Sequence, residues 1–270
     1  MSRTPAARRS PYAVRAGTWA LTLLLLTACG SGSDAAVGPH AARATATGSA
    51  GVAGPQAEGG RAAPGPRAPR AVPRAIPALG PRTTVEIPAD SRQALVVTGD
   101  SYDSSLSSAV LYTRDDPALG WRAVTDRWPA RNGLNGWTDE HWENDLRTPT
   151  GVYGLTSAGG LLDAPGTMLP YSQNPAFTVG GEGFDGEPLA GSFDYVIAID
   201  YNRVPGGSPL DPQRPLGRER GGGIWIHVDH DGPTQGCIAL PENRMRELLQ
   251  LLDPAKKPVV VMGDAEGLER

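Results

Sequence analysis

The chain has 270 residues, including 35 glycines and 26 prolines, and a formal net charge of −4. This composition excludes a collagen, a coiled coil and a polytopic membrane protein. Of the 16 aromatic residues, 14 follow Arg82, and residues 29–82 contain none. A segment without large apolar side chains cannot bury enough surface to offset the entropy lost on ordering. We therefore expect one folded domain, residues 83–270, behind a flexible tether rich in Ala, Pro, Gly and Arg, residues 29–82.

Charge is unevenly distributed along the chain. Residues 1–28 and 29–82 each carry a net charge of +4, whereas 15 basic and 27 acidic residues follow Arg82 and give −12. An acidic domain binds nucleic acid poorly, because phosphate contacts need clustered Lys and Arg. The sequence therefore predicts no nucleic-acid partner. An acidic surface either attracts amine-bearing substrates or serves solubility, and the composition leaves both open.

The first 28 residues are typical of a targeting segment. Four arginines precede an apolar run that ends at Cys29 and is too short to cross a hydrocarbon layer of ~30 Å. The sequence Leu-Thr-Ala-Cys at residues 26–29 resembles the lipobox of bacterial lipoproteins, which implies cleavage before Cys29 and lipidation of its sulfur. We expect a signal peptide over residues 1–28 and an exported protein that is held at the membrane by Cys29. An ordinary secretory signal is the alternative.

In the folded part, alternating apolar residues predict strands. The clearest is residues 193–201, FDYVIAIDY, in which large apolar side chains occupy every second position. A helix is expected after Pro241, because apolar residues recur there at helical spacing before Asp253-Pro254 ends the pattern. The sequence therefore predicts a mainly β domain with a few short helices. The other expected strands are residues 83–87, 94–98, 108–113, 121–125, 223–228 and 258–262.

Cys237 is the candidate nucleophile. The chain has two cysteines, and lipidation of Cys29 would leave Cys237 as a lone thiol in a polar, glycine-bearing loop. A disulfide with Cys29 and a buried, inert cysteine are the alternatives. His227 precedes Cys237 by ten residues, and a turn at residues 232–233, Gly-Pro, would bring the chain back and place the thiol beside the imidazole. An imidazole that accepts the thiol proton supplies the nucleophilic thiolate.

Other side chains near this segment are candidates for supporting roles. We expect the backbone amides of Gln235 and Gly236 to form an oxyanion hole. The substrate-contact candidates are Thr234, Asp229, Tyr153 and His141. Two of them have alternatives: Asp229 is equally compatible with facing solvent instead of a substrate amine, and His141 with lying in an exposed loop.

A metal site built from the histidines and Cys237 is disfavoured. His227 and His230 lie three residues apart, and such residues face opposite sides of a strand unless the strand ends between them. We therefore expect neither a metal nor a cofactor.

The segment TQGC (234–237), the strand histidine before it, and the helix and PVVVMG segment after it resemble the catalytic domain of the L,D-transpeptidase (YkuD-like) family. The signature of that family is a histidine followed by Ser/Thr-x-Gly-Cys, and TPTGVYGL (148–155) resembles a second family motif, TPxGxF. The resemblance covers roughly residues 90–263. The chain departs from the family at Gln235, where histidine is usual, at Ala239, where a polar or basic residue is common, and in a shorter His-to-Cys spacing.

The resemblance implies a β-sandwich with a few short helices and a cysteine-dependent acyltransferase that remodels peptidoglycan. Cys237 would attack a stem peptide at its third residue, release D-Ala as the thioester forms, and pass the acyl group to an amine of a second stem as a 3–3 cross-link. His227 would act as general base and then acid, oriented by a backbone carbonyl, and carbapenems would acylate Cys237.

Two rival functions remain open, namely an L,D-carboxypeptidase that hydrolyses the same acyl-enzyme and a non-catalytic module that binds the cell envelope. We expect peptidoglycan stem peptides and the membrane as partners, a monomer, and a location facing the cell wall.

Overall fold

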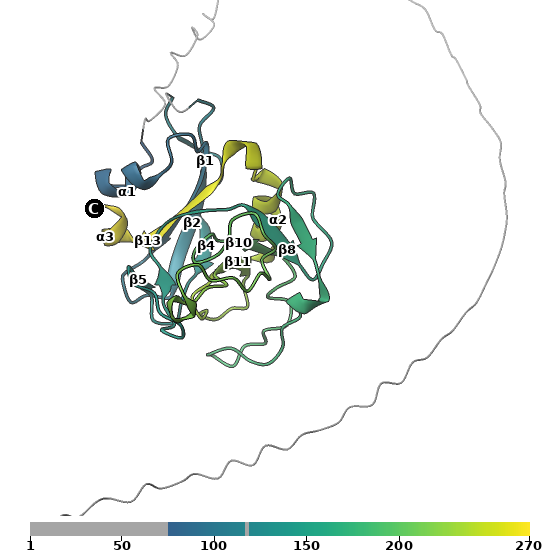
Figure 1. Cartoon of the computed structure of the whole chain (residues 1–270). Coiled ribbons are helices and arrows are strands. Elements are labelled where there is room, and N and C mark those ends of the chain that lie inside the picture. The colour runs from purple at the N-terminus through teal and green to yellow at the C-terminus, as the bar shows by residue number, and fades with distance from the viewer. Residues whose placement is uncertain (1–74, 117–118) are drawn as a thin grey trace, which may run out of the picture. The chain divides into compact units, whose positions relative to one another are not determined.

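The computed structural model describes residues 75–116 and 119–270 (Figure 1). The expected signal peptide, Cys29 and most of the expected tether lie outside the described residues. The strands are β1 (Gln93–Gly99), β2 (Leu106–Thr113), β3 (Arg122–Ala123), β4 (Trp128–Arg131), β5 (Trp137–Thr138), β6 (Thr148–Pro149), β7 (Gly151–Gly154), β8 (Ser157–Gly160), β9 (Tyr171–Gln173), β10 (Val196–Ala198), β11 (Trp225–Val228), β12 (Ile238–Leu240) and β13 (Val259–Asp264). The α-helices are α1 (Pro81–Glu86), α2 (Glu242–Leu251) and α3 (Ala265–Leu268), and short 3₁₀ turns cover Pro175–Phe177, Arg218–Arg220 and Pro254–Lys256.

Most of the strands belong to one sheet. Its order is β7-β13-β1-β2-β4-β12-β11-β10-β8-β9, with β3 paired to β2, while β5 and β6 form a separate pair. β11 is antiparallel to β10 and parallel to β12, so it has a hydrogen-bonded neighbour on each side. A strand inside a sheet has its register fixed by both neighbours, and this bears directly on the site described below.

The sheet curls around one large apolar core. Leu95 of β1 and Ile226 of β11 belong to the same buried cluster, although β1 and β11 lie far apart in the sheet order, and Leu248 of α2 belongs to it as well. The two layers expected of a sandwich are therefore arms of one continuous sheet. The prediction of a mainly β fold with a few short helices is confirmed.

Several expected elements are found. The strands expected at residues 94–98, 108–113, 223–228 and 258–262 correspond to β1, β2, β11 and β13. The expected helix is α2, which buries Met245, Leu248 and Leu249, and Pro241 stands just before its first residue. None of the helices in the described part of the chain is long and apolar enough to cross a membrane.

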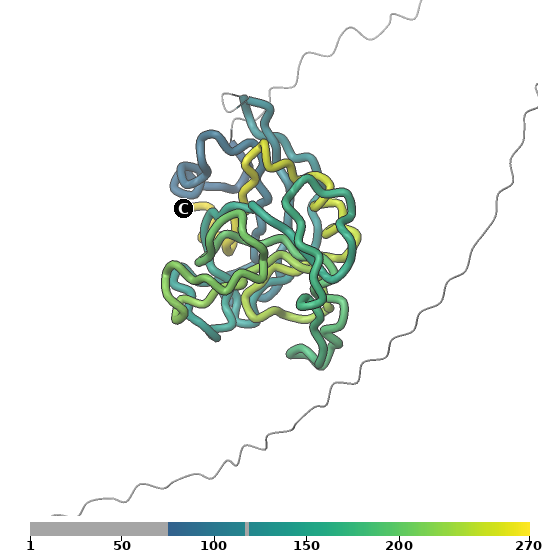
Figure 2. Tube along the Cα trace, turned by 45° about the vertical axis from the view of Figure 1, so that its right-hand side comes forward, coloured from purple at the N-terminus to yellow at the C-terminus, as the bar shows by residue number. Residues whose placement is uncertain are grey.

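The strand expected at residues 83–87 is wrong, because this segment is the helix α1. Proline occupies the first helical position, where its fixed φ favours a helix start, and this outweighs the β-propensity of the threonines and valine that follow. The backbone amides of Gly80 and Arg82 donate to the carbonyls of Leu268 and Arg270, and both views show α1 beside the C-terminus (Figures 1 and 2).

The domain also begins earlier than expected. Ile76, which the tether prediction included, is 2 % exposed and packs in a second apolar cluster with Val261 and Leu268. The boundary at residue 83 therefore cuts into the folded part.

Two expected strands are shorter than their patterns suggest. Within residues 193–201, Val196–Ala198 alone pairs with neighbouring strands. Residues 195–199 are buried on both faces, so the alternation of side-chain size does not separate a core face from a solvent face. Residues 121–125 contribute Arg122–Ala123, a short pairing along β2.

Candidate active site

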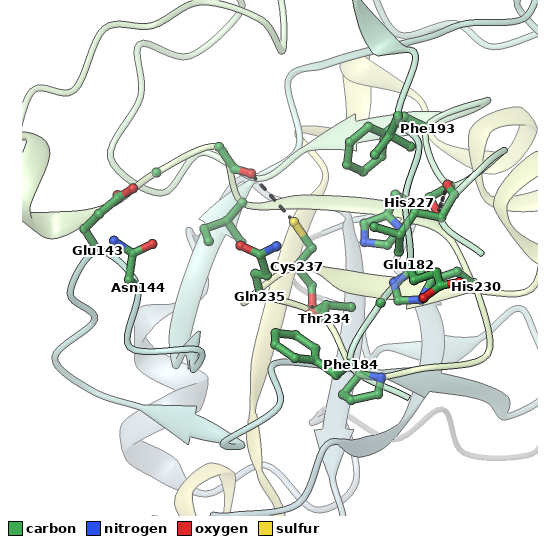
Figure 3. A pocket seen from close by; sticks show the side chains of 18 of the residues that line it. Glu143, Asn144, Glu182, Phe184, Phe193, His227, His230, Thr234, Gln235 and Cys237 are labelled. Carbon is green, nitrogen blue, oxygen red and sulfur yellow. Dashed lines mark hydrogen bonds between the residues drawn. The ribbon is translucent and has the colours of Figure 1, made fainter. Parts of the chain in front are cut away.

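A pocket of about 440 Å³ opens beside β11 and β12 (Figure 3). Residues 179–193 form one wall, residues 222–224 form another, and the chain from β11 to Cys237 forms the floor. The side chains most relevant to chemistry that line it are His141, Glu143, Glu182, Phe184, Phe193, His227, His230, Thr234, Gln235 and Cys237.

The parallel pairing of β11 with β12 places the thiol. Ile226 pairs with Ile238 and His227 with Ala239, so Cys237 stands one step earlier, beside Trp225. The Trp225 amide donates to the Cys237 sulfur at 3.4 Å, and the thiol in turn faces the Gly223 carbonyl oxygen at 3.7 Å. Because side chains alternate along a strand, Cys237 shares a face with Ala239 and His227.

The strand pairing brings Cys237 and His227 onto neighbouring strands, as predicted. Residues 229–236 return the chain to the start of β11, and β12, which begins just after the thiol, then runs parallel to β11. Cys237 is a free, half-buried thiol, and Figure 3 shows its sulfur and the His227 ring along the same side of the pocket.

His227 has its ring fixed by the backbone. Its Nδ1 lies 2.8 Å from the Val228 carbonyl oxygen, which assigns the proton to Nδ1 and leaves the Nε2 lone pair as the basic site. Phe193 packs edge-on against the ring, with centroids 5.4 Å apart. A carbonyl thus does the orienting that a carboxylate does in other dyads, as the family resemblance implied.

Burial keeps both members of the pair neutral at rest. It lowers the pKa of His227 to about 4, against the opposing effect of the hydrogen bond to Val228. It also raises the pKa of the Cys237 thiol to about 11, although the Trp225 amide acts in the opposite direction. The hypothesis of a standing thiolate is therefore corrected, because the resting site holds a neutral thiol and a neutral imidazole.

The loop before the nucleophile is held by Thr234. Its hydroxyl donates to the Cys237 carbonyl oxygen at 2.7 Å and accepts from the Gly236 amide at 3.1 Å. Thr234 lines the pocket, but its hydroxyl is engaged in shaping the loop rather than turned to a substrate. The Gly236 amide is engaged by this hydroxyl, so its predicted role in an oxyanion hole is corrected. The same role for the Gln235 amide stays a prediction.

Asp229 and Tyr153 are not brought to the pocket. The Asp229 carboxylate lies 3.3 Å from Nε of Arg131 and also accepts the Asp231 amide at 3.0 Å. The Tyr153 hydroxyl donates to the Thr150 carbonyl oxygen at 2.7 Å, and its ring packs against the core. Both predictions of substrate contact are therefore wrong, because each polar group already has a partner elsewhere.

His141 is brought to the pocket. It is 4 % exposed, its Nδ1 lies 3.0 Å from Asp145 Oδ1, and burial lowers its pKa. The exposed-loop alternative is thereby excluded. The loop that carries Gly221–Gly223 across from it is held by Asn202, whose amide nitrogen donates to the carbonyls of Gly217 and Gly221.

A second histidine, His230, lies in a loop that lines the pocket, as expected of a loop residue near the cleft. β11 ends at Val228, so His230 lies beyond the strand and stacks its ring on His227, with centroids 5.7 Å apart and planes 8° apart. Parallel stacked rings do not direct two nitrogens at one ion. No group of three or more His, Cys, Asp or Glu in residues 75–116 and 119–270 is arranged to hold a metal.

Comparison with known proteins agrees with this geometry. The family model of the L,D-transpeptidase catalytic domain, YkuD, matches residues 103–261. The chain belongs to this family. The match spans both β11 and β12 and includes every residue of the pocket named above.

A solved structure and the curated proteins add little to the family match. The crystal structure of the helical cell shape determining protein Pgp2 from Campylobacter jejuni is similar with a TM-score of 0.36 and 20 % sequence identity; the match covers 66 % of this chain and 52 % of that one. This chain therefore spans about half the length of that protein. Comparison with curated protein sequences gave no significant match.

Proposed function

We propose that the protein is an L,D-transpeptidase that joins two peptidoglycan stem peptides through a thioester on Cys237. The observation that carries the proposal is the register of β11 and β12, which places a free thiol and a carbonyl-oriented imidazole on one face of a pocket. Membership in a family of L,D-transpeptidase domains supports the same chemistry.

The first half of the reaction uses both members of the pair. Cys237 attacks the carbonyl carbon of the third stem residue while its proton passes to Nε2 of His227. The carbon–nitrogen bond to D-Ala then breaks, His227 returns the proton to the leaving amine, and a thioester remains. Backbone amides near Gln235 stabilise the oxyanion, for which one donor contributes about 3 kcal/mol in comparable sites.

The pocket suits this substrate in size and charge. Its volume of about 440 Å³ accommodates a peptide segment, and Glu143 and Glu182 line it beside apolar Phe184 and Phe193. Carboxylates favour the ammonium groups that a stem peptide carries, which gives the acidic character of the domain a function beyond solubility.

Hydrolysis of the same acyl-enzyme by water is the second candidate, because the dyad serves either acceptor. To separate them, the protein is incubated with a tetrapeptide stem, with and without a second stem as amine acceptor, and the products are identified by mass. A transpeptidase yields a cross-linked dimer, whereas a carboxypeptidase yields the tripeptide in both mixtures. If the folded protein yields neither product, the non-catalytic binding module is favoured.

We also propose that the protein is exported, anchored by a lipid on Cys29 and facing the cell wall. The basic and apolar segments before Cys29 and the lipobox-like sequence support this. Membrane fractionation tests it: wild type should sediment with the membrane, and Cys29→Ser should not. If wild type and Cys29→Ser were divided in the same way between membrane and soluble fractions, the proposed lipid anchor would be overturned.

A further inference from the structure

Beside Cys237 and His227 lies a histidine–carboxylate pair that the first half-reaction does not use. Nδ1 of His230 is 3.0 Å from Glu187 Oε1, and the two side chains are 6 % and 9 % exposed. His230 lines the pocket and stacks on His227, the residue next to the nucleophile (Figure 3). Since Glu187 takes Nδ1, Nε2 is the nitrogen that remains for a substrate.

The structure holds Glu187 in place for this contact. The Asp185 amide donates to Glu187 Oε2 at 2.8 Å, and the Gly183 amide donates to the Glu187 carbonyl oxygen at 2.8 Å. A Cβ added to Gly183 or to Gly232 would fall 1.9 Å from Glu187 Oε1. Two separate segments therefore leave space for this one carboxylate, and backbone amides together with His230 hold its pKa below the ordinary value.

The second half of a transpeptidation needs a second base. An alkyl amine with a pKa of about 10 reaches the site as an ammonium ion at neutral pH. It must lose one proton to become nucleophilic and another when the amide forms. His227 accepts one proton and returns it to the departing Cys237 sulfur, which leaves one proton without an acceptor.

We propose that His230, with Glu187 on its Nδ1, removes the first proton from the acceptor ammonium. The proposal rests on the transpeptidase function above. In this step Nε2 of His230 takes the proton, and the free amine attacks the thioester carbonyl. The new carbon–nitrogen bond forms, the carbon–sulfur bond breaks, and the second proton reaches sulfur through His227. His230 then releases its proton to solvent through the open pocket.

Several titratable groups surround His230. Glu187 contacts it from the hairpin at residues 179–191, His227 stacks on it from β11, and Glu182 lines the same pocket. Asp231 follows it in the chain and is exposed. Positive charges on two stacked imidazoles would repel each other, so His227 and His230 accept their protons in sequence.

The experiment uses acceptors that differ in amine pKa. The protein receives a tetrapeptide donor together with an alkyl amine, an amino acid amide with a pKa of about 8, or hydroxylamine, which is neutral at pH 7. Mass spectrometry gives the ratio of aminolysis to hydrolysis for each acceptor. Hydrolysis of the same acyl-enzyme is the internal reference. Water loses one proton before the thiolate leaves, and His227 alone accepts it, so hydrolysis does not need the second base.

Three variants remove the second base in different ways. His230→Gln removes the imidazole, Glu187→Gln removes the carboxylate charge, and Gly232→Ala displaces the carboxylate while both partners stay in the chain. Asp231→Asn is the matched control, because it removes a neighbouring charge without touching the pair, and asparagine tolerates the φ of 68° there.

With the alkyl amine at pH 7, we expect the aminolysis ratio to fall about 100-fold in His230→Gln and about tenfold in the other two variants. With hydroxylamine the aminolysis ratio of each variant should match that of wild type. Raising the pH toward 10 should restore the aminolysis ratio that the variants lose with the alkyl amine. An equal loss for all three acceptors would overturn the role of His230, as would an unchanged ratio. Absence of any acyl-enzyme in wild type would overturn the transpeptidase function itself.

Discussion

Cys237 and the outer wall of its pocket are held by different kinds of structure. Cys237 directly precedes β12, and the β12 residues Ile238 and Leu240 are fully buried in the main core. The hairpin at residues 179–191 is exposed over most of its length. It depends on backbone hydrogen bonds, such as Leu189 to Gly181 at 3.1 Å, and on the pair of Glu187 with His230.

This difference separates stability from chemistry. A change in the strands should disturb the fold and the thiol together, because the register of the sheet positions both. A change in the hairpin should leave the fold nearly intact and alter how substrate meets the thiol. Variants in the two regions therefore test whether the site is built in this divided way.

The largest effect is expected at His227, in the strand region. His227→Gln removes the proton acceptor for the thiol, and the rate of acylation by a tetrapeptide donor should fall about 10²- to 10⁴-fold. Single-turnover formation of the thioester, followed by intact mass, measures this step alone. A fall of less than threefold would show that another group deprotonates Cys237.

Ile238→Ala should be the next largest and should act on stability. The side chain is fully buried in the main core, so its truncation should lower the free energy of unfolding by about 2–5 kcal/mol. Urea denaturation measures the change. Because Cys237 precedes Ile238 directly, the variant should also acylate more slowly at temperatures where it is still folded.

Acid should weaken the strand region through His227. The folded protein binds a proton there with a pKa of about 4, whereas the unfolded chain does so near 6.5. As the pH falls from 6.5 to 4, the unfolded state gains protons first, and the free energy of unfolding drops by about 3 kcal/mol. Above pH 6.5 this contribution is constant.

Denaturation at pH 7.5 and at pH 4.5 measures this loss. His227→Gln serves as the control, since it retains the other titrating groups and should lose less stability over the same interval. Equal losses in both proteins would contradict the burial of a neutral His227.

The smallest effect on stability is expected in the hairpin. Phe184 lines the pocket but is 44 % exposed, so Phe184→Ala should change the free energy of unfolding by no more than about 0.5 kcal/mol. If the pocket binds the stem peptide as proposed, the variant should raise the KM for the tetrapeptide donor several-fold with little change in kcat, because the ring lines that pocket. A loss of stability comparable to Ile238→Ala would remove the distinction between the two regions.

The sequence predicted the strand region better than the wall. β1 and β13 are short apolar runs rich in valine, and such runs predict strands because they fit a pleated, buried surface. The approach of Cys237 to His227 followed from the motif, although the parallel pairing behind it did not. Local spacing does not state whether a chain returns beside a strand in the same or the opposite direction.

Some of the parts that escaped prediction depend on distant contacts, and others on local ones. Glu187 lies 43 residues before His230, in a glycine-rich loop without a periodic pattern, so nothing local pairs the two. Asp229 looked available because its partner, Arg131, lies 98 residues earlier in the chain. The Tyr153 hydroxyl, by contrast, is taken by a nearby carbonyl, that of Thr150. At α1, a proline that starts a helix outweighed β-branched residues that favour a strand.

The proposed function requires Cys237 to be a reactive nucleophile served by His227 within an open pocket. Incubation with a carbapenem, followed by intact mass and by peptide mapping to locate the adduct, tests this reactivity. We expect one adduct on Cys237, formed more slowly in His227→Gln and absent from Cys237→Ala. A folded protein that forms no adduct, or an adduct that persists in Cys237→Ala, would contradict it.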